Sequence, residues 1–192
     1  PYGLEPGRID PLPADRPRSP LRLAYCGVLS PWKAPHLVVD AVRDSELDVQ
    51  LTIHGRTEEP MFQDYIDRMR ERAAGDARIH FAGAYDAADA PAVFAAMDVL
   101  VVPSTWYENT PFVVLEAFAA GVTVLASDLG GLSEVVRDGE NGFLFAAGDE
   151  AALRARIGEL CADRDWFRRR SAAVPPDIAA NYRVFRALYA AR

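Results

Sequence analysis

The feature that most constrains the fold is an alternation of short apolar runs with longer helical segments along residues 21–161. Three apolar runs, at residues 21–26, 49–54 and 78–82, each end at a glycine. The run at 99–103 holds four consecutive apolar residues, a pattern typical of a strand buried on both faces. Strands that alternate with helices predict parallel βαβ units. We therefore expect an α/β fold, a doubly wound Rossmann-like parallel sheet of about six strands.

Two further apolar runs, at residues 122–126 and 142–145, complete the expected sheet. Helices are expected at residues 35–43, 60–74, 88–97, 111–120, 132–137, 150–161, 166–173 and 178–191. The first 20 residues contain six prolines, which deny that stretch a regular ladder or helix interior. We expect a linker over residues 1–20, one domain over 21–174 and a C-terminal helical segment over 175–192.

Composition excludes several classes of protein. Half of the 192 residues are hydrophobic, enough for the core of one large domain. The net charge of −7 argues against nucleic acid as the main partner. No apolar run is long enough to span a bilayer, and no signal segment opens the chain. Two cysteines, Cys26 and Cys161, indicate no disulfide scaffold and fit a reducing cytoplasm, and without a His/Cys cluster we expect no metal site.

Two loops of the expected sheet should meet in one crevice. In a doubly wound sheet, ligands bind beyond the carboxyl ends of the strands where the strand order reverses, between the first and fourth strands. The loops that follow those strands here are residues 28–33 and 105–110. The first ends at Lys33, and the second carries Glu108. Topology alone therefore predicts that Lys33 and Glu108 approach each other.

The second loop also predicts an anion site at the start of the next helix. Thr110 can cap that helix, and Pro111 suits its first turn, where a missing N–H costs nothing. The free amides of Phe112 and Val113 would then point out of the helix end. Together with the helix dipole, these amides favour a phosphate. Such caps are common, so this signal is weak by itself.

Two charged residues invite more than one interpretation. Lys33 is the only lysine beside 20 arginines. Either it escaped a general replacement of lysine by arginine, or its position needs a compact ammonium. Glu116 lies in an otherwise apolar helix, where an unpaired buried carboxylate is costly. It either pairs with a nearby donor or accepts hydrogen bonds from ligand hydroxyls.

Several motifs resemble one enzyme family. Residues 108–117, ENTPFVVLEA, resemble the E-x7-E motif of the family 4 (group 1) glycosyltransferases. The similarity continues, in the same order, through AGVTVLAS (120–127), GGLSEVV (130–136), DGENGFLF (138–145) and GD (148–149). Upstream, YCGVLSPWK (25–33) resembles the glycine-to-lysine loop of the family, and PYGL (1–4) resembles the segment after its interdomain hinge.

The resemblance implies the C-terminal, donor-binding half of a GT-B fold, from a retaining enzyme that uses a nucleotide-diphosphate sugar. It assigns Lys33 to the donor pyrophosphate, Glu108 to the transferred sugar and phosphates, and Glu116 to the ribose hydroxyls. Backbone amides after Glu108, at Asn109, Thr110, Phe112 and Val113, would hold phosphate or sugar. Gly27 and Val28 belong to the first donor loop.

Two positions depart from the family pattern. Val28 stands where many members have arginine directly after the first-loop glycine. One pyrophosphate-binding cation is therefore missing or comes from elsewhere, with Arg56 as a candidate. Ala34 stands where many members have glycine after the lysine, so the conformation of this loop is open.

The absent half would supply the acceptor site and the base, so we expect this chain to bind donor but to transfer nothing alone. We expect no cofactor, and catalysis without metal, because the crevice loops hold no Asp-x-Asp pair. The C-terminal helix would pack toward the absent half. We place the protein in the cytoplasm, either free or at the inner face of the membrane. From Glu150 onward the chain has nine arginines and five acidic residues. This local positive charge is either a solvated helix face or a contact with a partner or membrane.

Two alternatives to a transferase half remain. A catalytically silent module could keep the fold and only bind a nucleotide or dock a partner, and a nucleotide-sugar epimerase could share the fold. The pair Trp106 and Tyr107 is either hydrophobic packing or a sugar platform, with partial exposure expected. The lone histidines His36, His54 and His80 are more often structural than catalytic, although His54 and His80 end or lie within strands and could line the crevice.

Overall fold

The computed structural model describes residues 19–109 and 111–163. Six strands and six helices alternate along this part of the chain. The strands are β1 (Leu21–Cys26), β2 (Val49–His54), β3 (Ile79–Phe81), β4 (Val99–Val102), β5 (Thr123–Ser127) and β6 (Gly142–Phe145). The helices are α1 (Pro35–Arg43), α2 (Gln63–Ala73), α3 (Ala90–Ala95), α4 (Phe112–Ala119), α5 (Gly131–Val135) and α6 (Glu150–Ala162).

The strands form one parallel sheet in the order β3-β2-β1-β4-β5-β6. This confirms the predicted doubly wound sheet and its strand order. The order reverses between β1 and β4, whose register pairs are Leu23 with Val99 and Ala24 with Leu100. The connections that follow these two strands therefore open at the same carboxyl edge, and the ligand crevice is expected there.

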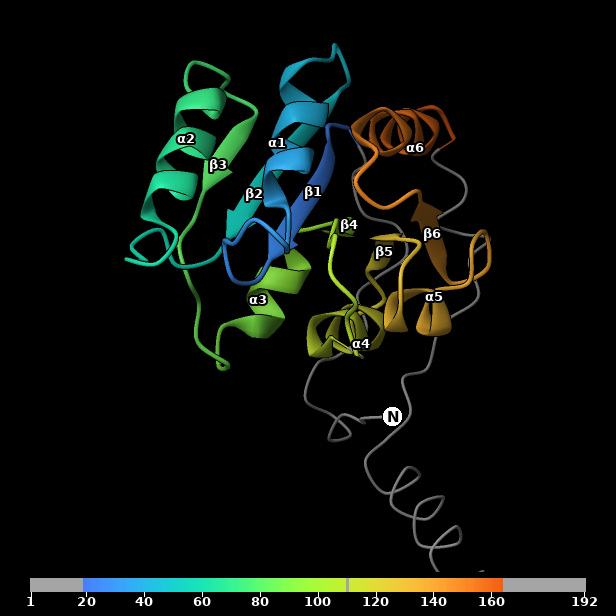
Figure 1. Ribbon diagram of the computed structural model, residues 1–192. Helices are drawn as coiled ribbons and strands as arrows, with labels where there is room; N and C mark the ends of the chain where they lie inside the picture. The colour runs from blue at the N-terminus through green and yellow to red at the C-terminus, as the bar shows by residue number, and fades with distance from the viewer. Residues whose placement is uncertain (1–18, 110, 164–192) are drawn as a thin grey trace, which may run out of the picture.

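Helices cover both faces of the sheet (Figure 1). On one face, α1, α2 and α6 pack on the odd positions of β1, such as Leu23 and Tyr25. On the other, α3, α4 and α5 pack on Ala24 and Cys26. All four residues of β4 are buried, as its uninterrupted apolar run predicts. Burying an aliphatic side chain contributes about 1.5–3 kcal/mol, so the centre of the sheet is the most stabilising part of the fold.

Element ends differ from the sequence-based expectations. Helix α2 begins at Gln63 and not at residue 60, α3 spans only Ala90–Ala95, and β3 has three residues. Apolar periodicity marks the presence of a helix more strongly than its ends, which depend on capping and tertiary contacts. The expected linker up to residue 18 and the helices expected after residue 163 lie outside the described residues.

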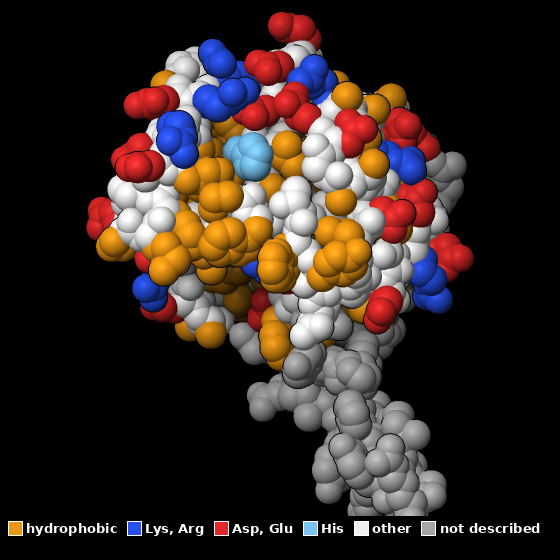
Figure 2. Space-filling view, in the orientation of Figure 1, with side chains coloured by type: hydrophobic (Ala, Val, Ile, Leu, Met, Phe, Trp, Pro, Cys, Tyr) orange, Lys and Arg blue, Asp and Glu red, His pale blue; other side chains and the backbone are white. Residues whose placement is uncertain are grey.

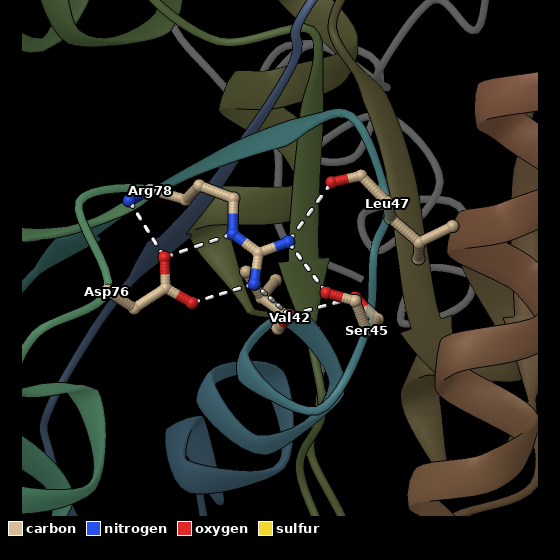
Figure 3. A network of polar contacts seen from close by, with 5 residues as sticks. All are labelled: Val42, Ser45, Leu47, Asp76 and Arg78. Atoms are coloured by element: carbon tan, nitrogen blue, oxygen red, sulfur yellow. Dashed lines mark hydrogen bonds and ion pairs between the residues drawn. The ribbon is translucent and has the colours of Figure 1, made fainter.

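Arg78 holds the connections at the amino edge of β2 and β3 together (Figure 3). Its guanidinium donates to the backbone carbonyls of Val42, Ser45 and Leu47 at 2.9, 2.8 and 3.2 Å. It also pairs with Asp76 through Nε–Oδ1 at 3.0 Å and Nη2–Oδ2 at 2.7 Å. These hydrogen bonds hold the pKa of Asp76 below its ordinary value. One arginine thus satisfies a carbonyl group of the last turn of α1 and two carbonyl groups that follow the helix.

A second ion pair closes the amino end of the seam between β1 and β4. Arg22 donates to Asp98 through Nε–Oδ2 at 3.0 Å and Nη2–Oδ1 at 2.6 Å. The backbone N–H of Arg22 donates to the same Oδ2 at 3.0 Å, and the N–H of Asp98 returns a bond to the carbonyl of Arg22 at 2.8 Å. Only 1% of the Asp98 side chain is exposed. This bidentate contact is a structural joint.

None of the helices within residues 19–109 and 111–163 has both the length and the apolar character needed to cross a bilayer.

Candidate nucleotide-sugar site

The loops after β1 and β4 are joined at the carboxyl edge of the sheet. Thr105 donates to the carbonyl of Trp32 through its backbone N–H at 2.8 Å and its hydroxyl at 3.2 Å. The next residue of the first loop, Lys33, donates from its ammonium group to Oε1 of Glu108. The two residues that topology predicted to approach each other therefore form an ion pair across the switch point.

Ser104 supports the same carboxylate. Its hydroxyl donates to Oε1 of Glu108 at 2.6 Å, and the serine itself is buried. The side chain of Glu108 is 11% exposed and that of Lys33 is 32% exposed, so the pair lies at the edge of solvent. Sequence reasoning did not identify Ser104 as a site residue. The available signal was its position as the polar residue that follows the apolar β4 segment and Pro103.

The conformation of the first loop is seen in the backbone at Ala34. It precedes α1 with φ 51° and ψ 40°, in the left-handed region that favours glycine. The backbone at Ala34 thus has a conformation that suits the glycine of the family pattern. An L-residue in this conformation costs about 1–2 kcal/mol, so the turn after Lys33 is held by its surroundings. Its N–H donates to the carbonyl of Ser30 at 3.1 Å, which closes the loop.

Two glycines at the start of α5 support the loop that carries Glu108. The N–H of Gly131 donates to the carbonyl of Glu108 at 2.8 Å. A β-carbon at Gly131 would lie 2.1 Å from the carbonyl oxygen of Asn109, so no other residue fits there without displacing the loop. Gly130, at φ 55°, has the ring of Tyr107 beside it. These contacts fix the backbone of Glu108 and Asn109.

A cavity of about 450 Å³ opens at the same edge of the sheet. This volume falls within the range of small-molecule sites. Five residues predicted to bind donor line it: Gly27, Val28, Arg56, Val113 and Glu116. The cavity lies beside the loops after β1, β2 and β3 and against α4.

The other predicted residues lie outside the cavity wall. Lys33 and Glu108 are on the two joined loops, Asn109 is exposed beside α5, and Phe112 is half exposed at the start of α4. Thr110 lies outside the described residues. The candidates therefore fall into two neighbouring groups, the ion pair and the cavity.

Glu116 is a buried carboxylate in the cavity wall, with 9% of the residue exposed. Helix α4 points this residue toward Cys26 at the end of β1. Burial raises the pKa of the Cys26 thiol to about 12, and the nearby charge of Glu116 adds to that rise. Cys26 therefore stays protonated at neutral pH and serves as a small neutral wall residue.

His54 and Tyr85 complete the wall on the side of β2 and β3. Their rings meet edge to face at 5.4 Å between centroids. Burial lowers the pKa of His54, and the neighbouring His80 lowers it further, so His54 is neutral at neutral pH. His36, by contrast, contacts Tyr65 through Nδ1 at 2.8 Å and does not line the cavity. Sequence reasoning missed Tyr85, whose signal is its place two residues after Gly83.

The start of α4 differs from the prediction. Pro111 is the N-cap residue, with extended backbone and no capping side-chain hydrogen bond, and Phe112 is the first helical residue. The helix therefore begins one residue later than expected, and Thr110, the predicted cap, lies outside the described residues. The N–H of Val114 donates to the carbonyl of Pro111 at 3.0 Å. Val113 remains in the first turn and lines the cavity.

Exposed hydrophobic side chains gather at this edge. In the described ranges the large ones are Val28, Trp32, Met61, Trp106, Tyr107 and Phe112, all on loops at the carboxyl edge or at the start of α4. Trp106 and Tyr107 are 65% and 74% exposed, more than the partial exposure expected. Figure 2 shows hydrophobic side chains around a hollow on one face. Such a cluster marks a contact surface.

The part of the chain that the structure describes contains no cluster of metal-binding side chains. Across residues 19–109 and 111–163, no group of three or more His, Cys, Asp or Glu side chains could hold a metal ion.

The sequence and fold are similar to those of glycosyltransferases. A family model described as "Glycosyl transferases group 1" matches residues 20–163. The phosphatidyl-myo-inositol mannosyltransferase of Mycobacterium leprae is 36% identical over 156 residues, which cover 79% of this chain and 40% of that protein. The glycogen synthase of Mycobacterium tuberculosis is 33% identical over 177 residues, or 90% of this chain and 42% of that protein.

Solved structures agree. The Anabaena protein HepE in complex with UDP superposes with a TM-score of 0.79 at 26% identity, over 90% of this chain and 49% of that chain. The sucrose-phosphate synthase of Thermosynechococcus elongatus gives a TM-score of 0.78 at 26% identity, over 100% of this chain and 52% of that chain. The chain thus spans less than half of the first two relatives and about half of these two structures.

Proposed function

The chain belongs to the group 1 glycosyl transferases, and from this premise we propose that it is the donor-binding half of a retaining enzyme. The donor would be a nucleotide-diphosphate sugar, and the sugar would pass to an acceptor hydroxyl. The Lys33–Glu108 pair beside the cavity is the observation that carries the proposal. UDP in the HepE structure supports a nucleotide diphosphate as ligand.

The pair has bonding capacity left for a ligand. Lys33 uses one ammonium hydrogen on Glu108, and both Lys33 and Ser104 bond to the same carboxylate oxygen. Among residues 19–109 and 111–163, Oε2 of Glu108 has no hydrogen-bond donor. A departing nucleotide diphosphate gains negative charge, which the Lys33 ammonium would stabilise. Glu108 would accept hydrogen bonds from hydroxyls of the transferred sugar.

The cavity supplies the nucleoside part of the proposal. Glu116 would accept hydrogen bonds from the ribose hydroxyls, and Gly27 and Val113 would let the ligand approach the backbone of the first loop and the first turn of α4. Amides after Glu108, including that of Asn109, would bind phosphate or sugar. Thr110 lies outside the described residues, so this part of the proposal rests on the backbone amides.

The direct test is a titration of the chain with UDP, GDP and ADP, each beside its nucleoside. We expect one diphosphate to bind, and Lys33→Ala to weaken it about tenfold or more, since a charged hydrogen bond contributes about 1.5–3 kcal/mol. The matched nucleoside should bind equally to both proteins. Equal losses for both ligands, or no loss, would contradict the assignment of Lys33.

Glu116 is tested through the sugar of the nucleotide. A site built to bond a hydroxyl strongly rejects an analogue that lacks it. The wild-type chain should therefore prefer ribonucleotides to 2′,3′-dideoxyribonucleotides, and Glu116→Ala should abolish that preference. A wild-type chain without the preference would show that Glu116 has a structural role.

Three wider parts of the proposal need the full-length protein. Transfer should continue in a chelator, because Lys33 and the backbone amides at the start of α4 would take the leaving charge. The product should keep the anomeric configuration of the donor. The 192-residue chain should bind donor but transfer nothing alone. Loss of activity that Mn²⁺ or Mg²⁺ restores, an inverted product, or comparable transfer by the chain alone would contradict the respective part.

A silent nucleotide-binding module is the second candidate, favoured by Val28, which leaves the position directly after Gly27 without a cation. Such a module would bind diphosphate without any turnover in the full-length protein.

We place the enzyme in the cytoplasm, where nucleotide sugars would be its donors, and fractionation of cells tests that location. Contact with the inner face of the membrane would appear as protein in the membrane fraction that salt releases.

A further inference from the structure

Arg56 is the only cationic side chain among the described residues that line the cavity. The other charged wall residues, Glu59 and Glu116, are both carboxylates. Arg56 is exposed, and within residues 19–109 and 111–163 it makes no ion pair with either of them. A free guanidinium beside two carboxylates in a concave wall adds nothing evident to the fold. It does offer a planar fork of donors to an anionic ligand.

The adjacent ends of β1 and β2 bring Val28 and Arg56 to the same cavity. The last register pair of β1 and β2 is Cys26 with His54. The segments that follow the two strands stay adjacent beyond this pair, because the N–H of Gly27 donates to the carbonyl of His54 at 2.9 Å. A β-carbon at Gly55 would lie only 2.4 Å from the carbonyl oxygen of Gly27. Val28 and Arg56 directly follow these two glycines, and both line the cavity.

Neighbouring strands are about 4.8 Å apart, and an extended arginine side chain reaches farther than that. A guanidinium anchored at residue 56 can therefore enter the space above residue 28. Val28 leaves that space open to solvent, since it is 54% exposed and also lines the cavity. A glycine at position 55 is what allows the second chain to come this close.

We propose that Arg56 binds the diphosphate of the donor from the second strand and supplies the cation that the first loop lacks at Val28. This inference rests on the proposed function, because it concerns the same ligand. Lys33 would hold the diphosphate from the side of β4, and Arg56 from the side of β2. The two cations would then bracket the ligand across the switch point.

The experiment moves the charge between the two positions. Arg56→Ala should weaken UDP about tenfold, with uridine binding unchanged, and Val28→Arg added to Arg56→Ala should restore most of that affinity. Arg68→Ala, which removes an exposed arginine from α2, is the charge-matched control and should bind UDP like the wild type. Thermal unfolding of each variant should match the wild type, since Arg56 and Val28 are exposed. GDP and ADP replace UDP in parallel titrations, with guanosine and adenosine as their controls.

Two results would overturn the inference. Arg56→Ala that binds the diphosphate like Arg68→Ala would remove Arg56 from the site. A double variant as weak as Arg56→Ala would show that the two positions do not serve one subsite. Lys33→Ala, titrated alongside, separates these failures from failure of the proposed function, because it should lose affinity whatever Arg56 does. A wild-type chain that binds none of the three diphosphates would reject the proposed function itself.

Discussion

The two ends of the seam between β1 and β4 carry ion pairs of opposite design. At the amino end, Arg22 gives Asp98 two guanidinium bonds and a backbone bond, and Asp98 is almost fully buried. At the carboxyl end, Lys33 gives Glu108 one bond and stays 32% exposed. The first pair uses its donors and acceptors on the protein. The second pair keeps hydrogen-bond donors and acceptors available for a ligand. This difference separates a structural joint from a binding site.

The largest expected effect comes from breaking the amino-end joint. Asp98→Ala would leave the backbone N–H of Arg22 and its guanidinium without this acceptor. We expect a loss of about 2–3 kcal/mol in the free energy of unfolding, less than for a fully buried pair because Arg22 is 30% exposed. Denaturant unfolding measures it.

Glu140→Ala is the control for that prediction, because it breaks the Arg137–Glu140 pair, in which both side chains are more than 60% exposed. Its loss should stay below about 0.5 kcal/mol. Equal losses for the two variants would mean that burial of Asp98 adds nothing to the joint.

Exchanging the cations sharpens the comparison. Arg22→Lys loses the bidentate geometry and should cost about 1 kcal/mol of stability. Lys33→Arg should leave unfolding almost unchanged but weaken diphosphate binding about fivefold, since a planar fork does not replace a compact ammonium. Unfolding curves and titrations of both variants provide the measurement. A stability loss at Lys33 as large as that at Arg22 would erase the proposed distinction.

The smallest effect concerns the turn after Lys33. Ala34→Gly would relieve the left-handed conformation but add freedom to the unfolded chain and remove a buried methyl group. These terms oppose each other, so we expect a change within about 0.5 kcal/mol, against a strain of about 1–2 kcal/mol.

Ala41→Gly on α1 is the matched control, because Ala41 is equally buried but helical. It should lose about 1 kcal/mol or more in the free energy of unfolding. A loss of that size at Ala34 would mean that its conformation carries no strain.

The sequence predicted most of the fold because burial of helices and strands leaves a periodic pattern of apolar residues in it. The apolar run of β4 and the glycines after β1, β2 and β3 reveal parallel strands without reference to any other protein. Strand order followed from a general rule, and that rule placed Lys33 beside Glu108 across 75 residues of chain. Long-range geometry was predictable there because topology decides it.

Side-chain partners were less predictable because topology does not decide them. Nothing local tells that Asp98 is the acceptor of Arg22, or that the hydroxyl of Ser104 joins Glu108. The start of α4 was misplaced by one residue because proline usually suits the first turn of a helix, whereas Pro111 here has extended backbone and precedes the helix. The wall residue Tyr85 depends on how the segment after β3 folds over the sheet, which periodicity does not encode, whereas His54 was predictable as a crevice residue from its place at the end of a strand.

The single lysine gives the site a natural chemical handle. Lys33 offers the only ε-amine in this sequence, and it is partly exposed beside the cavity. Amine-reactive reagents therefore have one side-chain target, apart from the terminal amine of the chain. Acylation removes the charge on which the ion pair with Glu108 depends, and a ligand bound over the ammonium shields it from the reagent. Mass spectrometry of Lys33 labelling with and without ligand thus measures how much of the site at the carboxyl edge is occupied. The measurement needs neither a mutation nor turnover.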